Sequence, residues 1–185
     1  MILQLVDKDS PILRQEMPIF DFSNPPINPV DLYNNMGETM LAENGLGLSA
    51  NQVGLPYRMF VIRASEVIGV FNPKIVDQSE EQIYLEEGCL SYPGLFVKIK
   101  RPKKIKTRFT LPNGEIVTKV FDGLTARCFQ HELDHLNGLL YNNRASKFHL
   151  DRAKQKAKQV ARGNLKISIN SKVSENTQET LRWLK

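Results

Sequence analysis

The stretch QHELDHLNG, residues 130–138, carries two histidines four positions apart, with a glutamate directly after the first. On a helix this spacing puts His131 and His135 on one face, one turn apart, which suits a single metal ion. Glu132 is then placed to handle protons rather than to bind the metal. The chain has three histidines, and two of them lie in this motif. The pattern favours a metal site over two ordinary helix histidines, but a catalytic metal needs a third ligand.

HExxH on a helix is most often found in zinc peptidases, yet neither common peptidase pattern is complete here. Metzincins carry a third histidine six residues after the second, and this chain has Tyr141 at that position. Thermolysin-like enzymes use a downstream glutamate, but none lies between Glu132 and Glu175. A cysteine thiolate is therefore the best remaining candidate for the third ligand.

The chain has two cysteines, Cys89 and Cys128. Cys128 lies about 10.5 Å along the helix axis from His135, whereas two atoms bound to one metal lie within about 4.4 Å of each other. We therefore expect Cys128 to be a small apolar residue near the site, and the third histidine, His149, to lie on the surface. Cys89 lies in EEGCLSYPG, where the neighbouring glycine lets the backbone come close to a metal. The predicted ligands are Cys89, His131 and His135, with a fourth position open for water, as in catalytic sites.

Length and composition indicate one compact domain. The chain has 185 residues, and 41% of them are hydrophobic, enough for a core. No apolar run is long enough to span a membrane, and the N-terminus resembles neither a secretory signal nor a transit peptide. Two cysteines are too few for a disulfide framework. We expect a monomeric cytoplasmic protein without membrane attachment, with an organelle as the alternative location.

The net charge of +5 is unevenly distributed. Residues 98–108 and residues 144–166 each carry +7, so the rest of the chain carries −9. Two basic segments on an acidic body suggest a polyanionic partner such as RNA. The alternative is that both segments are solvated lysine-rich faces, and by themselves the charges favour that alternative.

Hydrophobic periodicity predicts an α+β fold in which antiparallel strands pack around the central metal-binding helix. Helices are predicted from residue 30 to Gly45, from Asp122 as the cap to Gly138, and from 147 to about 162, the last one basic. Strands are predicted in YRMFVIR (57–63), IGVFNPKIV (68–76), FVKIK (96–100), KIKTRFTL (104–111) and EIVTKVF (115–121). In 104–111 apolar residues alternate with basic ones, which indicates a half-buried strand. The polar segment 163–185, with Trp183, has no predicted structure.

Three ordered stretches together resemble the signature motifs of the peptide deformylase family: GLGLSANQ (45–52), EGCLS (87–91) and QHELDHLNG (130–138). The resemblance covers residues 1–150, which we predict to be the catalytic domain, and 151–185 are predicted to be a basic helix and polar tail. One departure is Ser49, where the family usually has alanine, and we expect little effect from it. The resemblance implies a hydrolase of protein biosynthesis that removes the formyl group from N-formylmethionine of nascent peptides and so takes part in N-terminal methionine processing. It implies Fe²⁺ as the native metal, with Zn²⁺, Ni²⁺ or Co²⁺ as substitutes.

The resemblance also implies residue roles. Glu132 takes a proton from the attacking water and delivers it to the leaving amine. The side-chain amide of Gln52 and the backbone N–H of Leu90 stabilise the oxyanion. The methionine pocket is formed by Leu46, Leu124 and Cys128, and backbone at Gly45, Gly47 and Gly88 binds the peptide as an added strand.

The basic helix suggests a further partner, ribosomal RNA near the exit of the nascent chain, with a solvated face as its alternative. Two other functions are less favoured. A metallopeptidase would carry the same metal-binding helix, and cleavage of an unformylated peptide would distinguish it from a deformylase. An RNA-binding module would explain the lysines but not an open metal site.

Overall fold

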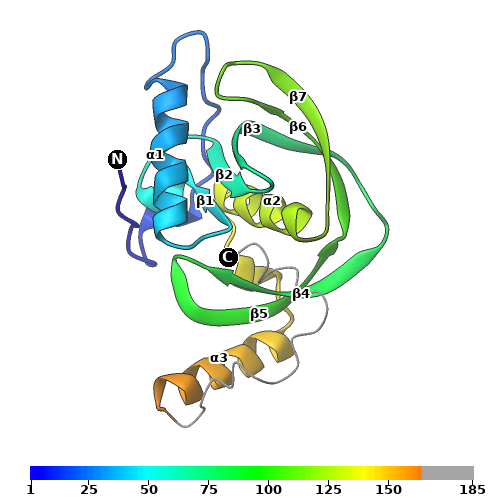
Figure 1. The fold of residues 1–185 in the computed structure, drawn as a ribbon. Helices are drawn as coiled ribbons and strands as arrows, with labels where there is room; N and C mark the ends of the chain where they lie inside the picture. Colours follow the sequence, from blue (N-terminus) through cyan, green and yellow to red (C-terminus); the bar gives the residue numbers. More distant parts are fainter. Residues whose placement is uncertain (164–185) are drawn as a thin grey trace.

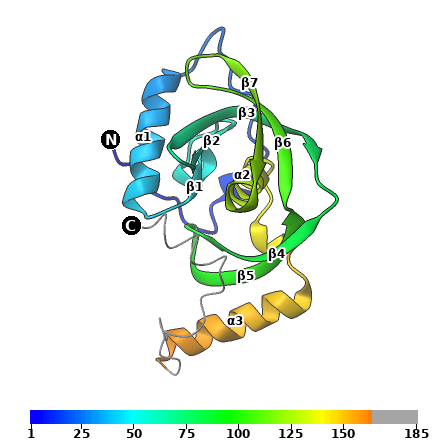
Figure 2. The same ribbon diagram turned by 45° about the vertical axis from the view of Figure 1, so that its right-hand side comes forward.

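The computed structural model describes residues 1–163 of the chain. At its centre lies helix α2, Gly123–Leu136, which carries the HExxH motif and is surrounded by strands (Figures 1 and 2). Helix α1, Pro29–Ala42, lies on one side, and helix α3, Lys147–Ala161, lies beneath the β4–β5 strands (Figure 1). The predicted α+β class is confirmed.

The strands of residues 1–163 form two antiparallel sheets. The larger has the order β1-β2-β3-β6-β7, with bounds Gly47–Ser49, Met59–Arg63, Val67–Gln78, Lys104–Thr110 and Ile116–Asp122. The smaller pairs β4, Gln82–Cys89, with β5, Tyr92–Pro102. Short 3-10 helices cover Pro11–Arg14, Ala50–Val53 and Tyr141–Arg144.

Local sequence explains the ends of α2. The Asp122 carboxylate accepts a hydrogen bond from the Gly123 N–H, so the predicted cap is confirmed. After the helix, Gly138 has a φ of +69°, a left-handed conformation that glycine adopts without strain. A Cβ at Gly138 would lie 2.7 Å from the carbonyl oxygen of Arg14, so this position excludes a side chain for a second reason. The N-terminal segment can therefore pass close to the C-terminal end of α2.

Strand β2 separates the two main parts of the core. Phe60 and Ile62 face the cluster that includes α2, whereas Met59 and Val61 face the cluster that includes α1. Both faces are buried, which explains why MFVIR is continuously apolar rather than alternating. Strand β6 has one wet face, and its predicted alternation is confirmed: Ile105, Thr107 and Phe109 are buried, and the basic residues between them are exposed.

Helix α3 packs on β5 through a third cluster, which contains Val97, Ile99, Tyr141 and Ala153. The predicted helix from 147 to about 162 is thus confirmed. The division of the chain at residue 150 stays a prediction, and α3 begins before it. Trp183 and the rest of the tail after residue 163 lie outside the described residues. No helix in residues 1–163 is both long and apolar enough to cross a membrane.

Phe129 should be a main determinant of stability. Its fully buried ring lies 5.0 to 6.1 Å from those of Phe60, Phe109 and Phe121. We expect Phe129→Ala to lower the free energy of unfolding by about 3 to 5 kcal/mol, because it leaves a cavity in the core. The matched control Phe148→Ala, at a ring that is 67% exposed, should change it by less than about 0.5 kcal/mol. Equal effects in denaturant titrations would contradict this assignment of the core.

Candidate metal centre

The structure brings the three predicted metal ligands together. His131 and His135 are buried on one face of α2, with ring centroids 5.0 Å apart. Cys89 ends β4, and its Sγ lies 3.2 Å from His135 Nε2. One ligand atom from each of the three residues lies within 4.8 Å of the others. This spacing is close to what a shared metal requires, because metal–sulfur and metal–nitrogen bonds are about 2.3 and 2.1 Å long.

The β4–β5 hairpin positions the thiol. Cys89 pairs with Tyr92 across a two-residue turn, and the register between the strands shifts after Glu87. Gly88 lies in this irregular segment, where a Cβ would meet the Phe96 ring at 2.7 Å. The absence of a side chain at Gly88 therefore lets the ring cover the backbone beside the ligand. One thiolate and two imidazoles suit several divalent metals and leave a fourth position open.

Glu87 fixes the first histidine. Its Oε2 lies 3.0 Å from His131 Nδ1, which leaves the Nε2 of that ring for a metal. Glu87 also accepts two hydrogen bonds from Arg101, at 2.7 and 2.9 Å, and one from Arg127 at 2.8 Å. Burial alone would raise the pKa of Glu87, but the hydrogen bonds from His131 and Arg101 outweigh it and hold the pKa far below its usual range. Glu87 therefore stays an anion.

A second carboxylate extends this network. Arg101 Nη1 donates to Asp134 Oδ2 at 2.6 Å, and Asp134 also binds Arg144. Sequence reasoning did not find Glu87, Arg101 or Asp134, although two of them stand inside the quoted motifs. Arg101 was counted in the basic segment 98–108 as one solvated charge among seven. In the structure it is 5% exposed, whereas Lys98 and Lys100 beside it are exposed.

Glu132, which is 3% exposed, lies between α2 and β1. Its Oε2 accepts a 2.7 Å hydrogen bond from the Ser49 hydroxyl. Its Oε1 lies over Gly47, where an added Cβ would be only 2.4 Å away. Burial raises the pKa of Glu132, and the hydrogen bond from Ser49 opposes that rise. A buried carboxyl with a raised pKa is suited to accept and return a proton.

Gln52 has a defined amide orientation. Its Oε1 accepts from the backbone N–H of Ser49 at 2.9 Å, so its Nε2 must point the other way. That Nε2 lies 3.1 Å from Ser91 Oγ and 3.4 Å from Cys89 Sγ. The donor group therefore faces the predicted ligands.

The predicted pocket residues are arranged as follows. Cys128 Sγ donates to the Leu46 carbonyl oxygen at 3.1 Å, and burial raises the pKa of this thiol well above its usual value. Cys128 is therefore a neutral thiol, and it is not part of the cluster of potential metal ligands. Leu124 is partly buried one helical turn before Cys128. The Leu90 side chain packs against Gly45.

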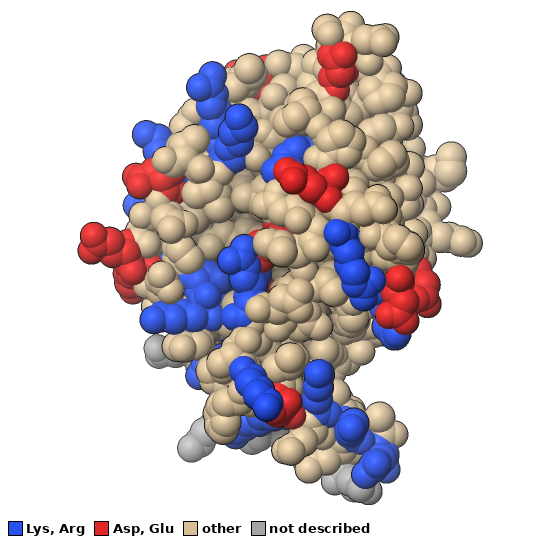
Figure 3. Space-filling view, turned by 180° about the vertical axis from the view of Figure 1, so that it is seen from behind, with Lys and Arg blue, Asp and Glu red and all other residues tan. Residues whose placement is uncertain are grey.

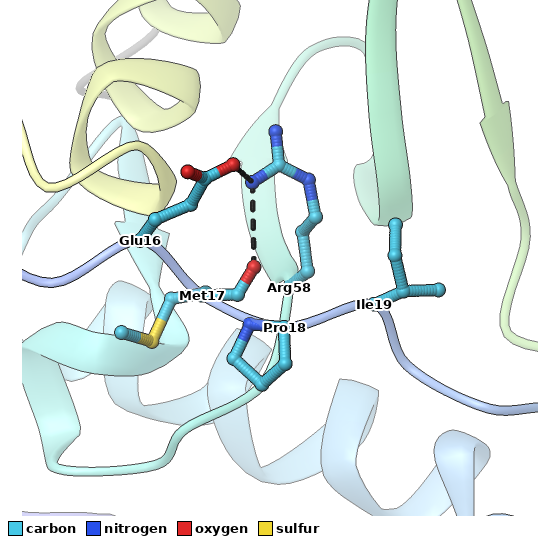
Figure 4. Close-up of a pocket in the computed structure, with 5 residues that line it drawn as sticks. All are labelled: Glu16, Met17, Pro18, Ile19 and Arg58. Carbon is cyan, nitrogen blue, oxygen red and sulfur yellow. Dashed lines mark hydrogen bonds and ion pairs between the residues drawn. The ribbon is translucent and has the colours of Figure 1, made fainter.

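A separate pocket of about 320 Å³ is formed where the N-terminal segment meets Arg58 (Figure 4). It is lined by Glu16, Met17, Pro18, Ile19 and Arg58. Arg58 donates to the backbone oxygens of Met17 and Leu136 and to Asn137 Oδ1. Its guanidinium thus holds the N-terminal segment against the end of α2, and the pocket contains none of the predicted site residues.

Comparison with known proteins identifies the family. The family model described as polypeptide deformylase matches residues 2–151. The chain is 43% identical over 138 residues to a peptide deformylase of Thermotoga petrophila, which covers 74% of this chain and 82% of that protein. A peptide deformylase of Wolbachia pipientis is also 43% identical, over 71% of this chain and 82% of the relative.

Solved structures agree with this assignment. The peptide deformylase of Thermotoga maritima superimposes with a TM-score of 0.75 at 37% identity, over 79% of this chain and 99% of that one. The enzyme from Legionella pneumophila gives 0.75 at 31% identity, over 89% and 98%. The family match covers the three motifs and every residue of the metal cluster. The chain therefore belongs to the peptide deformylase family.

Proposed function

We propose that this peptide deformylase uses the residues between α2, β1 and the β4–β5 hairpin as its active site. The enzyme is a metal-dependent hydrolase that removes the N-formyl group from the start of new peptides. The observation that carries the proposal is the meeting of Cys89 with His131 and His135 beside a buried glutamate. We assign these three residues as the metal ligands and Fe²⁺ as the native metal, with Zn²⁺, Ni²⁺ or Co²⁺ as substitutes. A divalent ion held there supplies Lewis acidity, which makes water a nucleophile near neutral pH.

Glu132 is the proton carrier in this proposal. Its carboxylate takes a proton from the water that attacks the formyl carbon and later gives a proton to the leaving amine. Formate and a peptide with a free amino terminus are the products. The hydrogen bond from Ser49 and the contact with Gly47 hold the carboxylate on the β1 side of α2.

Gln52 and Leu90 supply the oxyanion donors. The Gln52 amide is oriented by the Ser49 N–H, so its NH₂ group faces the cluster before substrate arrives. A donor fixed in advance needs no reorganisation when charge develops, which is why such groups lower the barrier. The Leu90 N–H lies in the turn directly after Cys89 and is assigned as the second donor.

The substrate peptide is proposed to bind as an added strand. In the described part of the chain, β1 pairs only with β2, so one of its edges is free for an extended peptide. The backbone groups assigned to hydrogen-bond the peptide are those of Gly45, Gly47 and Gly88, which carry no side chain of their own. Leu46, Leu124 and Cys128 are assigned to the methionine pocket, which the neutral Cys128 thiol suits.

The decisive assay is formate release from a formylmethionyl peptide by anaerobically purified protein, with the metal quantified. An unformylated twin of the peptide tests the metallopeptidase alternative. Formate release only from the formylated peptide, by protein that contains metal, is the expected result. Cleavage of internal peptide bonds would contradict the proposal.

We further propose that the protein is a cytoplasmic monomer that docks on ribosomal RNA through α3. Lys and Arg side chains gather over α3 at the bottom of Figure 3. Arg152, Lys154, Lys156 and Lys158 are all exposed, and Asp151 is the one acidic residue of the helix. The apolar side of α3 is used in packing on β5, so the basic side faces outward.

Replacement of Glu132 by alanine should separate chemistry from metal binding. We expect Glu132→Ala to keep its metal but to lose turnover by about 10³-fold, because no group then moves the proton. Steady-state kinetics and elemental analysis of the same preparation measure both quantities. Turnover near that of the unchanged enzyme would remove Glu132 from its proposed role.

The two cysteines form a matched pair for the metal assignment. Cys89→Ala should lose the metal, whereas Cys128→Ala should retain it, because the Cys128 thiol is engaged with the Leu46 carbonyl. Metal content per chain after anaerobic purification decides between them. A metal-replete Cys89→Ala protein would show that the third ligand is misassigned.

Charge reversal tests the ribosome proposal. The triple variant Lys154→Glu, Lys156→Glu and Lys158→Glu should weaken co-sedimentation with ribosomes and flatten its dependence on salt, because fewer counterions are released. The matched control reverses Lys104, Lys106 and Arg108, which are also exposed and alternate along β6. If the two triple variants co-sediment with ribosomes equally and with the same salt dependence, the basic face of α3 is a solvated surface rather than a docking site.

A further inference from the structure

The three residues of β1 present two different faces. Gly47 and Ser49 point toward α2, because alternate residues of a strand share a face, and Leu48 points into the core on the α1 side. Both residues on the α2 side meet the same partner, the Glu132 carboxylate. From the sequence alone, serine rather than alanine at position 49 is expected to have little effect. The structure instead places a hydroxyl against the buried carboxylate.

The contact between Ser49 and Glu132 is buried on both sides. Ser49 is fully buried and Glu132 is 3% exposed. Ser49 Oγ lies 2.7 Å from Glu132 Oε2 and 3.1 Å from the Glu132 backbone oxygen. A hydroxyl has one proton to donate, and a backbone oxygen at this place in a helix already faces the N–H four residues on. The hydroxyl therefore donates its hydrogen bond to the carboxylate rather than to the backbone oxygen.

No other hydrogen bond to the Glu132 carboxylate occurs within residues 1–163. A glutamate side chain has three rotatable torsions, and burial removes most of the water that would otherwise solvate it. Gly47 leaves room for Oε1 but offers no donor through a side chain. The Ser49 hydroxyl is thus the protein group that selects one orientation of the carboxylate.

We propose that Ser49 is a positioning residue for the reaction, whose hydroxyl holds the Glu132 carboxylate in its working orientation between β1 and α2. The inference rests on the proposed role of Glu132 as the proton carrier. Within residues 1–163 the Ser49 hydroxyl makes no hydrogen bond to Cys89, His131 or His135. It acts through Glu132, and its backbone N–H orients Gln52 in the same way, so that one residue of β1 sets the directions of two functional side chains.

The kinetic test is Ser49→Ala, which removes the hydroxyl and keeps the backbone N–H. We expect kcat for a formylmethionyl peptide to fall about tenfold with KM within twofold, because a hydrogen bond to a charged group is lost while substrate binding is untouched. Metal content should be unchanged. Thr107→Val is the control, since it removes another fully buried hydroxyl, on β6, and should leave kcat within twofold. A kcat within twofold for Ser49→Ala, or loss of its metal, would overturn the proposal.

A second measurement does not use activity. In denaturant titrations of the metal-free protein, Ser49→Ala should lower the unfolding midpoint, and this shift should shrink by at least half in a Glu132→Ala background. Equal shifts in both backgrounds would show that the hydroxyl acts on something other than Glu132. The two proposals fail separately. Turnover retained by Glu132→Ala removes the proposed role of Glu132 as the proton carrier, whereas an inactive Glu132→Ala beside a fully active Ser49→Ala removes the role of Ser49 alone.

Discussion

The hydrogen bond between Glu87 and His131 connects the two halves of the site. Glu87 lies two residues before Cys89 on the β4–β5 hairpin, and His131 lies on α2. When Glu87 meets His131, the hairpin is held at the distance that brings the Cys89 thiol to 3.2 Å from His135. The same contact fixes the ring of His131, with Nδ1 on the carboxylate and Nε2 toward the thiol. The arrangement of the three predicted ligands thus depends on a contact with Glu87, which is not one of them.

Buried arginines make this contact possible. An isolated carboxylate next to a metal site would be costly to bury, and Glu87 is stabilised by Arg101 from β5 and Arg127 from α2. Arg127 also donates to the backbone oxygens of Ile83 and Ile99, so it holds both strands of the hairpin to the helix. Such networks add little net stability compared with an apolar core, but loss of one partner is expensive, at about 3–5 kcal/mol. They therefore define one arrangement of hairpin and helix.

The opposite side of α2 is organised by small residues. Gly47 and Ser49 let β1 approach α2 closely, and the Glu132 carboxylate occupies the space that larger side chains would fill. Strand β2 behind them is buried on both faces and cannot move without disturbing two parts of the core. The glutamate is therefore held by a rigid sheet, while the thiol is held by the hairpin.

The amino-acid sequence by itself determined the HExxH helix with its Asp122 cap and Gly138 end, the alternating strand 104–111 and the fold class. It also predicted Cys89 rather than Cys128 as the third ligand, and Cys89 is the cysteine that lies with the two histidines. These follow from local periodicity and from the fixed rise of a helix, which a single chain reveals. Only the tertiary structure decided the rest: that Arg101 is buried rather than solvated, that Glu87 orients His131, and that Ser49 reaches Glu132 from 83 residues away. The sequence does not show which group a charged or hydroxyl side chain contacts, because that contact depends on how separate helices and strands pack and not on spacing along the chain.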